Sequence, residues 1–483
     1  MSIYPTFAEA LRTVMSAHQW SSETLADVVG YRSKTSVVRI LQEKSSQLNR
    51  QQFFNRLMDA QALRPDEIEL LHNALNTSMI GKDQACARGI IYDIIRGHTL
   101  QDQSISPNIE RALELLDSCA AADITMVNCM WPQISDKLGA LLNSHPEHQL
   151  HHMFTLQDNG TSAATALACT ARLAYLPNYQ GHALDQTDAE ASILTGANML
   201  CATATTAQGQ QVDLLVVING VSNAHIHTAP TPQGLYSFWR AALTEAAQGF
   251  HPITYKCDTA SGPASFVGIL RVMRDCEKRR ATYQITPDFC VNMLPAHCLR
   301  ASLIEGPMRA AFSQVDESTL DRLINEFVAC QRQRYDYMFN SRRAKHIIFS
   351  TRAVRHFAAT GMITSHFQAM RPFTPRERLE VLRNLHDHAL NDPYFNVYFF
   401  KDDFCPAYEI ACWEQNGMAC LPVNRPNALM SNYCCNIIRH PKLIKAFIGY
   451  FKDELRQNFT LPQAQAIEFL KSTIDRLECG QFN

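Results

Sequence analysis

Five polar side chains near the start of the chain have types and spacing that suit contact with DNA. They would share the outward side of one short helix: Lys34, Thr35, Ser36, Arg39 and Gln42. Lysine and arginine donate to guanine or to phosphate, and glutamine can pair bidentately with adenine. Serine and threonine hydroxyls can serve phosphates or base edges. The pattern therefore predicts a helix that reads double-stranded DNA.

The elements that must position this helix follow from local signals. Ser21 is a good N-cap for a preceding helix, and Gly30 stands where that helix would end in the left-handed conformation. Small Ala26 would let the two helices approach closely. Residues 1–58 carry seven basic and four acidic side chains, against a net charge of −2 for the chain. The predicted contact set is completed by three flanking residues, Arg32, Ser33 (the expected N-cap of the reading helix) and Lys44.

The stretch Leu25-Ala-Asp-Val-Val-Gly-Tyr-Arg-Ser-Lys-Thr-Ser-Val-Val-Arg-Ile-Leu resembles the helix-turn-helix of the XRE family of bacterial and phage repressors. The resemblance covers about 75 residues and implies a five-helix domain, with a fourth helix over 47–58 and a fifth over 65–75. It also implies double-stranded DNA as the partner of a homodimer, whose third helices enter successive major grooves. The sequence departs from the family where Gln42-Glu-Lys-Ser continues without a glycine.

Composition limits what the rest of the chain can be. Its 483 residues suffice for several domains, and 46% apolar with 19% charged residues is typical of globular proteins. The 16 cysteines form no C-x-x-C motif, which favours reduced thiols. The first residues lack the features of a signal peptide, and no apolar run approaches the roughly 20 residues of a membrane span. We therefore expect a cytoplasmic protein without a membrane partner.

We predict an α+β fold with three domains. Residues 1–79 form the all-α helix-turn-helix domain, 80–335 a mixed α/β body, and 336–483 an α+β sensor or dimerisation unit. Small and β-branched residues over 199–206, a turn at 208–211 and a nearly continuous apolar run over 212–218 predict one hairpin. A second is predicted over 408–423, with its turn at Asn416-Gly417. Thr374-Pro-Arg-Glu377 predicts a helix start with a capping box. The basic segment 331–345 is interpreted as a solvated linker, with a second DNA contact as the alternative.

The common catalytic and metal motifs are missing from the sequence. It contains neither a Gly-x-x-x-x-Gly-Lys-Ser/Thr phosphate loop nor a Gly-x-Ser-x-Gly elbow. His148 and His152 have the spacing that chelates a metal from a helix, within a cluster that begins at His145. His225 and His227 would share one side of a strand. A solvated loop and a plain strand explain these histidines better, so we predict no catalytic residue, metal or cofactor. Whether the cluster His145–His152 binds metal stays open.

The leading hypothesis is a sequence-specific transcriptional regulator that is not an enzyme. Its body would dimerise and bind a small-molecule or peptide effector. A pocket for that effector could lie in the aromatic stretch 394–413, although this stretch also fits an ordinary core. One alternative is an enzyme or phage-defence effector that the helix-turn-helix localises. The other is a protein-interaction module, in which the helical domain binds a protein instead of DNA.

Overall fold

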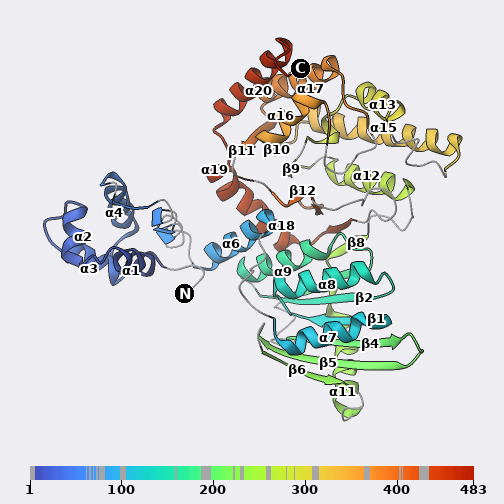
Figure 1. Ribbon diagram of the computed structural model, residues 1–483, viewed down its shortest axis with the longest axis horizontal. Coiled ribbons are helices and arrows are strands. Elements are labelled where there is room, and N and C mark those ends of the chain that lie inside the picture. Colours follow the sequence, from blue (N-terminus) through green and yellow to red (C-terminus); the bar gives the residue numbers. More distant parts are fainter. Residues whose placement is uncertain are drawn as a thin grey trace. The chain divides into compact units, whose positions relative to one another are not determined.

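The computed structural model describes the following residues: 6–60, 62–64, 67–68, 70–71, 74–75, 82–97, 105–157, 160–185, 197–220, 223–228, 233–256, 263–278, 280–287, 289–306, 315–363, 370–401, 404, 406–423 and 435–482. The chain divides into two compact units (Figure 1). The N-terminal unit comprises Met1–Ile90 with Asn159–Ser162, and the large unit comprises Ile91–Asp158 with Ala163–Asn483.

The N-terminal unit is helical. Its helices include α1 (Phe7–Ala17), α2 (Ser22–Val28), α3 (Thr35–Leu41) and α4 (Gln47–Asp59). At the start of α1, the Thr6 hydroxyl accepts a hydrogen bond from the Glu9 amide, and the Glu9 carboxylate accepts one from the Thr6 amide. This reciprocal capping box satisfies two backbone donors that the helix itself leaves unpaired. The position at which α1 begins is therefore determined by residues next to its start.

One apolar core joins these helices. Its members come from every helix named above and include Leu11, Leu25, Val37 and Phe53. The predicted fifth helix, 65–75, falls partly outside the described residues. Its apolar positions Leu71 and Leu75 are nevertheless buried in the same core.

The first sheet of the large unit has seven strands in the order β6-β5-β4-β1-β2-β3-β7. The strands are β1 (Cys119–Val127), β2 (Gln149–Leu156), β3 (Tyr179–Asp185), β4 (Met199–Thr206), β5 (Gln211–Gly220), β6 (Asn223–Thr228) and β7 (His251–Pro252). The three strands β1, β2 and β3 are parallel. On the other side of β1, the strands β4, β5 and β6 continue the sheet antiparallel to one another. The sheet is therefore mixed.

The second sheet has the order β11-β10-β9-β12-β13-β14-β8. Its strands are β8 (Thr254–Lys256), β9 (Thr282–Thr286), β10 (Lys345–Ser350), β11 (Phe395–Phe400), β12 (Tyr408–Trp413), β13 (Gly417–Pro422) and β14 (Asn436–Ile438). Strands β9, β10 and β11 are parallel. Strands β12, β13 and β14 follow antiparallel on the other side of β9. Each strand of β9–β14 thus has the place and direction that its counterpart in β1–β6 has in the first sheet.

The large unit therefore contains one topology twice, and we call β1–β6 the first repeat and β9–β14 the second repeat. The registers repeat as well. A row of directly paired residues crosses each sheet from the fourth strand of the repeat to its third: Cys201, Thr125, His151 and Gln180 in the first repeat, and Cys412, Tyr283, His346 and Asn396 in the second. A cysteine, a hydroxyl residue, a histidine and an amide thus occupy matching positions, and we call these the matched rows.

Helices cover both faces of the first sheet. They are α7 (Pro107–Asp117), α8 (Pro132–Ser144), α9 (Gly160–Leu173) and α11 (Gln233–Ala246), the last followed by η1 (Ala247–Gly249). Apolar residues of α7 and α8 pack on the face that presents Ile124 and Met126 of β1. Leu243 of α11 packs on the opposite face, against Val127 and Met199. Figure 1 shows α7 and α8 beside the strands of this sheet.

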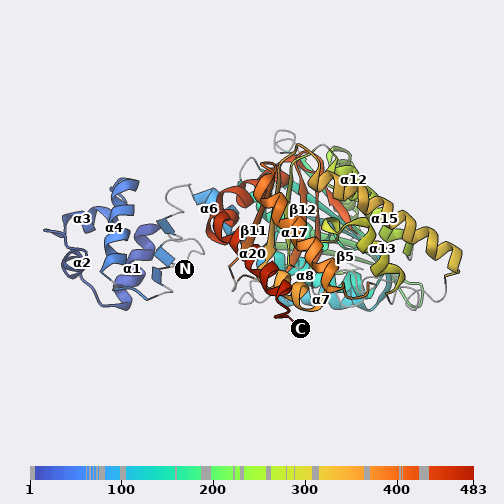
Figure 2. The same ribbon diagram turned by 90° about the horizontal axis from the view of Figure 1, so that it is seen from above.

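The second sheet is covered in the same way. Its helices are α12 (Pro263–Glu277), η2 (Val291–Met293), α13 (Ala296–Ile304), α15 (Glu317–Phe339), α16 (Thr351–Thr360), α17 (Pro375–Asn391), α18 (Pro441–Tyr450), the π-helical turn η3 (Phe451–Leu455), α19 (Arg456–Asn458) and α20 (Gln463–Glu478). Ile347 and Phe349 of β10 share a core with α13, α15, α16, α17 and α20. Phe451 of η3 packs edge-to-face on Tyr283 at the opposite face. Figure 2 shows α13 beside α15.

The two predicted hairpins are confirmed. Strands β4 and β5 pair from Met199↔Val217 to Thr205↔Gln211. Strands β12 and β13 pair as predicted, but the turn differs in detail. Gln415 takes the left-handed conformation at φ 68°, and Gly417, at φ 145°, is already the first residue of β13. The predicted capping box at Thr374 is also confirmed at the start of α17.

The interpretation of 331–345 as a solvated linker is wrong. Helix α15 continues through most of this segment, to Phe339, and Lys345 begins β10. Arg334 is buried and forms a bidentate ion pair with Glu277, at 2.9 and 2.7 Å. The buried Lys345 ammonium donates to the carbonyl of Arg343 and the hydroxyl of Ser341. These two charged side chains can be buried because each has polar partners inside the protein. The sequence around them does not indicate those partners.

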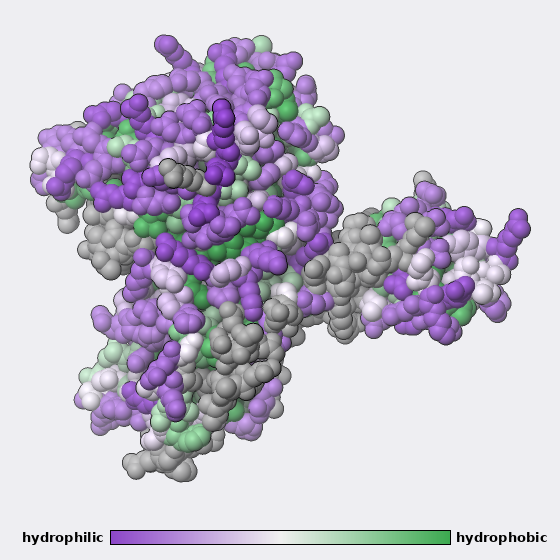
Figure 3. Space-filling view, turned by 180° about the vertical axis from the view of Figure 1, so that it is seen from behind, coloured by the Kyte–Doolittle hydropathy of each residue, from purple (hydrophilic) through white to green (hydrophobic). Residues whose placement is uncertain are grey.

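The predicted fold class, α+β with an N-terminal helical region, is confirmed. The second sheet takes strands from both sides of residue 335, and the predicted domain boundaries at 79 and 335 stay predictions. The aromatic stretch 394–413 supplies core in its described part, with Phe395, Phe399 and Trp413 buried. Among the described residues, no helix is long and apolar enough to cross a membrane. Figure 3 shows one face of the molecule, on which hydrophilic side chains predominate.

Candidate metal centre

The predicted DNA-reading helix forms, with a different start. Gly30 takes the left-handed conformation at φ 68° after α2, as predicted. Helix α3 then begins at Thr35 with Lys34 as its N-cap, and Lys34 makes no side-chain cap. The predicted cap by Ser33 is therefore wrong. Where the family would have a glycine after α3, Glu43 supplies the positive φ, at 58°.

All residues of the predicted DNA-contact set are exposed: Arg32, Ser33, Lys34, Thr35, Ser36, Arg39, Gln42 and Lys44. Exposure is necessary for DNA contact but does not demonstrate it, so this set stays a prediction. Lys34 lies 2.6 Å from the carboxylate of Glu23 on α2. Both side chains are more than half exposed, and such surface pairs contribute little to stability.

In the histidine cluster at 145–152, the rings of His145 and His148 stack with 4.7 Å between centroids, but His152 does not join them. The interpretation of this cluster as a solvated loop is wrong, because His148 and His152 are buried. His145 lies 3.0 Å from Asp117, and Nε2 of His148 contacts the Leu116 carbonyl at 2.9 Å. The helix that would let His148 and His152 chelate one ion is absent, because His152 belongs to strand β2. Positions four apart in a strand are separated by about 13 Å. His152 is fully buried, and burial lowers its pKa to about 3.

The other predicted histidine pair lies on β6. His225 pairs with Val217 and His227 with Leu215 across the sheet, so both positions share one side of the strand, as predicted. His225 is exposed. The side chain of His227 lies outside the described residues.

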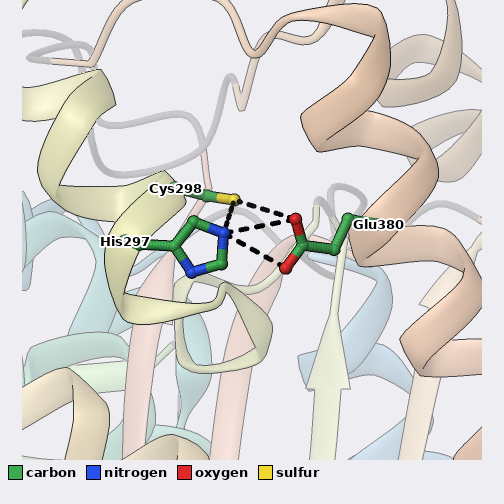
Figure 4. Close-up of side chains that lie close together, drawn as sticks. All are labelled: His297, Cys298 and Glu380. Atoms are coloured by element: carbon green, nitrogen blue, oxygen red, sulfur yellow. Dashed lines mark hydrogen bonds and ion pairs between the residues drawn. The ribbon is translucent and has the colours of Figure 1, made fainter.

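A different trio of side chains meets in the second repeat. His297 and Cys298 lie in the first turn of α13, directly after the N-cap Pro295. Glu380 projects from α17, the helix whose start is fixed by the capping box at Thr374. Figure 4 shows the three side chains pointing toward one another from the two helices. We call them the His–Cys–Glu cluster, and among the described residues it is the one group of three potential ligands that converges.

The distances within the cluster match those between ligands of one small ion. Nε2 of His297 lies 3.2 Å from each Glu380 oxygen and 3.2 Å from Sγ of Cys298. Sγ of Cys298 lies 3.8 Å from the nearer Glu380 oxygen. A tetrahedral zinc ion with ordinary bond lengths to nitrogen, oxygen and sulfur places its ligand atoms about 3.3–3.7 Å apart. The three side chains therefore have nearly the spacing of ligand atoms around a bound zinc ion.

The exposure of the three residues differs. Cys298 is fully buried, whereas the side chains of His297 and Glu380 are 69% and 44% exposed. Burial and the neighbouring carboxylates of Glu380 and Glu377 raise the pKa of the Cys298 thiol to about 12. Without a cation the sulfur is therefore a neutral thiol at pH 7, and a bound divalent metal would displace its proton.

Charged neighbours fix the helix that carries Glu380. Arg371 donates to both oxygens of Glu377, at 2.9 and 3.0 Å, and its Nε donates to Glu305 at 2.5 Å. Glu377 also accepts from the Thr374 amide. These bonds hold the first turn of α17, three residues before Glu380, and they lower the pKa of Glu377 to about 2 against the opposing effect of burial.

The residues present fit a zinc ion. Cysteine, histidine and glutamate are all ordinary zinc ligands, and three protein ligands leave a fourth position for water. Sequence reasoning missed the cluster because Cys298 and Glu380 are 82 residues apart. The adjacent His297-Cys298 pair after Pro295 was the one local signal. Nothing in the sequence indicates that α17 would place a carboxylate beside it.

Comparisons with known proteins give little. No protein-family model matches the chain, and no curated protein matches it. The crystal structure of polyphosphate kinase from Porphyromonas gingivalis is similar, with 10% sequence identity and a TM-score of 0.22. The match covers 87% of this chain and 65% of that chain, so this chain spans less than two thirds of its neighbour's length. A TM-score of this size supports no argument about reaction or substrate.

The predicted function, a DNA-binding transcriptional regulator with an effector-sensing body, is corrected by these findings. No family model of a regulator and no curated regulator matches the chain. The prediction extended a motif of 22 residues, Ser21–Gln42, to a chain of 483. Most of that chain is a duplicated unit in which three metal-ligand side chains converge. The predicted homodimer and effector stay predictions.

Proposed function

We propose that the large unit is a zinc enzyme that hydrolyses its substrate at the His–Cys–Glu cluster. The observation that carries this proposal is the mutual approach of three different ligand atoms, all within 4.8 Å of one another. A simple hydrogen bond between His297 and Glu380 would not explain why the sulfur of Cys298 lies close to both groups.

The number of ligands favours catalysis over a structural role. Structural zinc sites have four protein ligands, whereas catalytic sites have three and keep a position for water. The exposure of His297 and Glu380 leaves that position open to solvent and substrate. Zinc lowers the pKa of its bound water to about 7, which supplies hydroxide for addition to a carbonyl or phosphoryl centre at neutral pH.

The chain's own residues would prepare the site. Cys298 would contribute a buried thiolate, whose negative charge the metal and the first turn of α13 stabilise. Arg371 and Glu377 would act as positioning residues, because they fix the turn of α17 from which Glu380 projects. None of these steps requires the N-terminal unit.

The test is metal content combined with activity. The purified full-length protein should hold one zinc per chain by inductively coupled plasma mass spectrometry. H297A, C298S and E380Q should each lower zinc affinity about 10–100-fold or more and abolish metal-dependent hydrolysis of a panel of nitrophenyl esters and phosphates. C479S is the matched control, because Cys479 is an exposed thiol at the end of α20 and should leave both properties unchanged.

The proposal has two distinct ways to fail. Stoichiometric zinc that is lost in C298S, without hydrolysis of any panel member, would contradict the enzymatic role and leave a zinc-binding protein. Zinc content that is equal in wild type, C298S and E380Q would contradict the site itself.

We also propose double-stranded DNA as a partner of the N-terminal unit, without any role in regulation. The exposure of Lys34 and Arg39 on α3 supports this. A gel-shift titration with duplex DNA should show salt-dependent binding, and K34A or R39A should weaken it about 5–100-fold. Binding that neither substitution weakens would contradict this partner.

A further inference from the structure

The matched rows differ in the charges that surround their histidines. In the first repeat, Nε2 of His151 lies 3.9 Å from the carboxylate of Asp123, which is 64% exposed. In the second repeat, the corresponding His346 lies among aromatic rings and cations instead. Histidines at matching positions of the two repeats therefore differ in the charges around them.

His346 is part of an aromatic stack. Its ring lies nearly parallel to Tyr283 of β9, at 5.2 Å between centroids and 14° between planes. On its other side, Tyr398 of β11 lies at 6.3 Å and 16°. The Tyr398 hydroxyl and Nδ1 of His346 are 3.5 Å apart. Phe451 closes the stack edge-on against Tyr283 and His346. The imidazole is therefore held in one orientation.

Two cations flank this stack. Nζ of Lys452 lies 5.1 Å from the centroid of the Tyr283 ring, and the guanidinium carbon of Arg456 lies 5.9 Å from that of Tyr398. Both cations come from one short segment, the π-helical turn η3 and the residue that follows it. Single π-helical turns occur frequently at functional sites, because they displace side chains from ordinary helical positions.

The cations are not neutralised by ion pairs. Within the described part of the chain, neither Lys452 nor Arg456 has a carboxylate at ion-pair distance. A hydrogen bond with Tyr283 and, to a smaller extent, the charges of Glu414 and Asp453 raise the pKa of Lys452. Burial, Arg456 and Lys452 together lower the pKa of His346 to about 4. The site thus contains two positive charges and a neutral imidazole that can still donate a hydrogen bond.

We propose that Lys452, Arg456 and His346 bind a phosphate dianion, either as inorganic phosphate or as a phosphate monoester. Its two negative charges would balance the two cations. Arginine offers the planar fork that matches phosphate, and lysine adds a point charge. Lys452 and Arg456 are four residues apart on one helical segment, so their side chains leave it on neighbouring positions, and the charges of both act on His346. The site lies at the opposite face of the second sheet from the core that contains α13 and α17, and it is independent of the proposed zinc centre.

The test is calorimetric titration of the metal-free full-length protein with inorganic phosphate at constant ionic strength. We expect one saturable site per chain. K452A and R456A should each weaken binding about tenfold or more, since each removes a charge-assisted contact. H346F, which keeps the stack but removes the donor, should weaken it by a smaller factor. K471A on α20 is the matched control, because Lys471 is an exposed lysine away from the stack.

Further titrations separate the sources of the phosphate group. Phenyl phosphate should compete with inorganic phosphate, whereas vesicles of phosphatidic acid should not recruit the protein, because the cations lie partly buried beside the sheet. If vesicles recruit the protein and this depends on Lys452 and Arg456, the two cations bind a lipid headgroup, and the proposal of a site for free phosphate is wrong. Phosphate binding that is absent, or that K452A and R456A leave unchanged, would overturn the proposal.

Discussion

His152 should make the protein less stable as the pH falls, and the size of this effect follows from its burial. The side chain is fully buried in β2, and neither ring nitrogen has a hydrogen-bond partner among the described residues. Its ring packs against Phe154, with 3.8 Å between centroids. Burial lowers the pKa from 6.5 to about 3, so the folded protein keeps the imidazole neutral.

The direction of this pH dependence follows from the difference in proton binding between the unfolded and the folded chain. Below pH 6.5 the unfolded chain binds a proton at this histidine, whereas the folded chain does not until about pH 3. Stability is therefore fully present above pH 6.5 and is lost progressively as the pH falls toward 3. The slope approaches 1.4 kcal/mol per pH unit, so between pH 7 and 4.5 the loss is about 3 kcal/mol, and over the whole interval it is about 5 kcal/mol.

The assay is urea unfolding of wild type, H152L and H151L at pH values from 7 to 4.5, followed by near-ultraviolet circular dichroism. H152L should lose about 3 kcal/mol less stability than wild type over this range, because it has no proton to bind. H151L is the matched control, since the neighbouring His151 ring is partly exposed to water, and it should follow wild type. Identical pH dependence in wild type and H152L would show that burial of His152 does not suppress its protonation in the folded protein.

Three further perturbations test the packing of the second repeat by thermal and urea unfolding. E277Q should destabilise the protein by about 3–5 kcal/mol, because it leaves the buried Arg334 guanidinium without its ionic partner, and a loss below 1 kcal/mol would contradict the buried pair. G361A should be strongly destabilising, because Gly361 has φ 70° and an added Cβ would meet the backbone of Phe373; a melting temperature equal to wild type would exclude this conformation. T374A should cost about 1 kcal/mol through loss of the capping box, and an unchanged stability would show that the cap is dispensable.

Features that depend on neighbouring residues could be predicted from the sequence. The capping boxes at Thr6 and Thr374 need only a residue and its third successor, and both form. The hairpin of β4 and β5 needs a turn between two segments rich in strand-forming residues, and it forms as well. In each case the physical interactions lie within a few residues, so the sequence pattern and the structure carry the same information.

Features that depend on distant pairing could not be predicted. The partner of Arg334 is Glu277, 57 residues earlier, so a basic segment was mistaken for a solvated linker. The duplicated topology is visible only when strand order and register are known, because the matched rows share residue types at single positions in each strand. The His–Cys–Glu cluster was missed for the same reason, since the register of α13 against α17 comes from tertiary packing.

The same distinction explains the mistaken function. The helix-turn-helix predicted for the N-terminal unit rests on local signals, and the conformation of Gly30 and the exposure of α3 are compatible with that prediction. The extension from this unit to a regulator required knowledge of the large unit, and its sequence contained no motif that could supply it. For the large unit, the proposed function rests on the duplicated topology and on the three side chains that converge in its second repeat.

The central claim is that His297, Cys298 and Glu380 hold one zinc ion. The most direct measurement is zinc K-edge X-ray absorption of the purified full-length protein after one equivalent of zinc is added. We expect one sulfur ligand at about 2.3 Å and about three nitrogen or oxygen ligands at 2.0–2.2 Å, with the sulfur contribution lost in C298S. A spectrum without sulfur, with several sulfur ligands, or unchanged in C298S would contradict it.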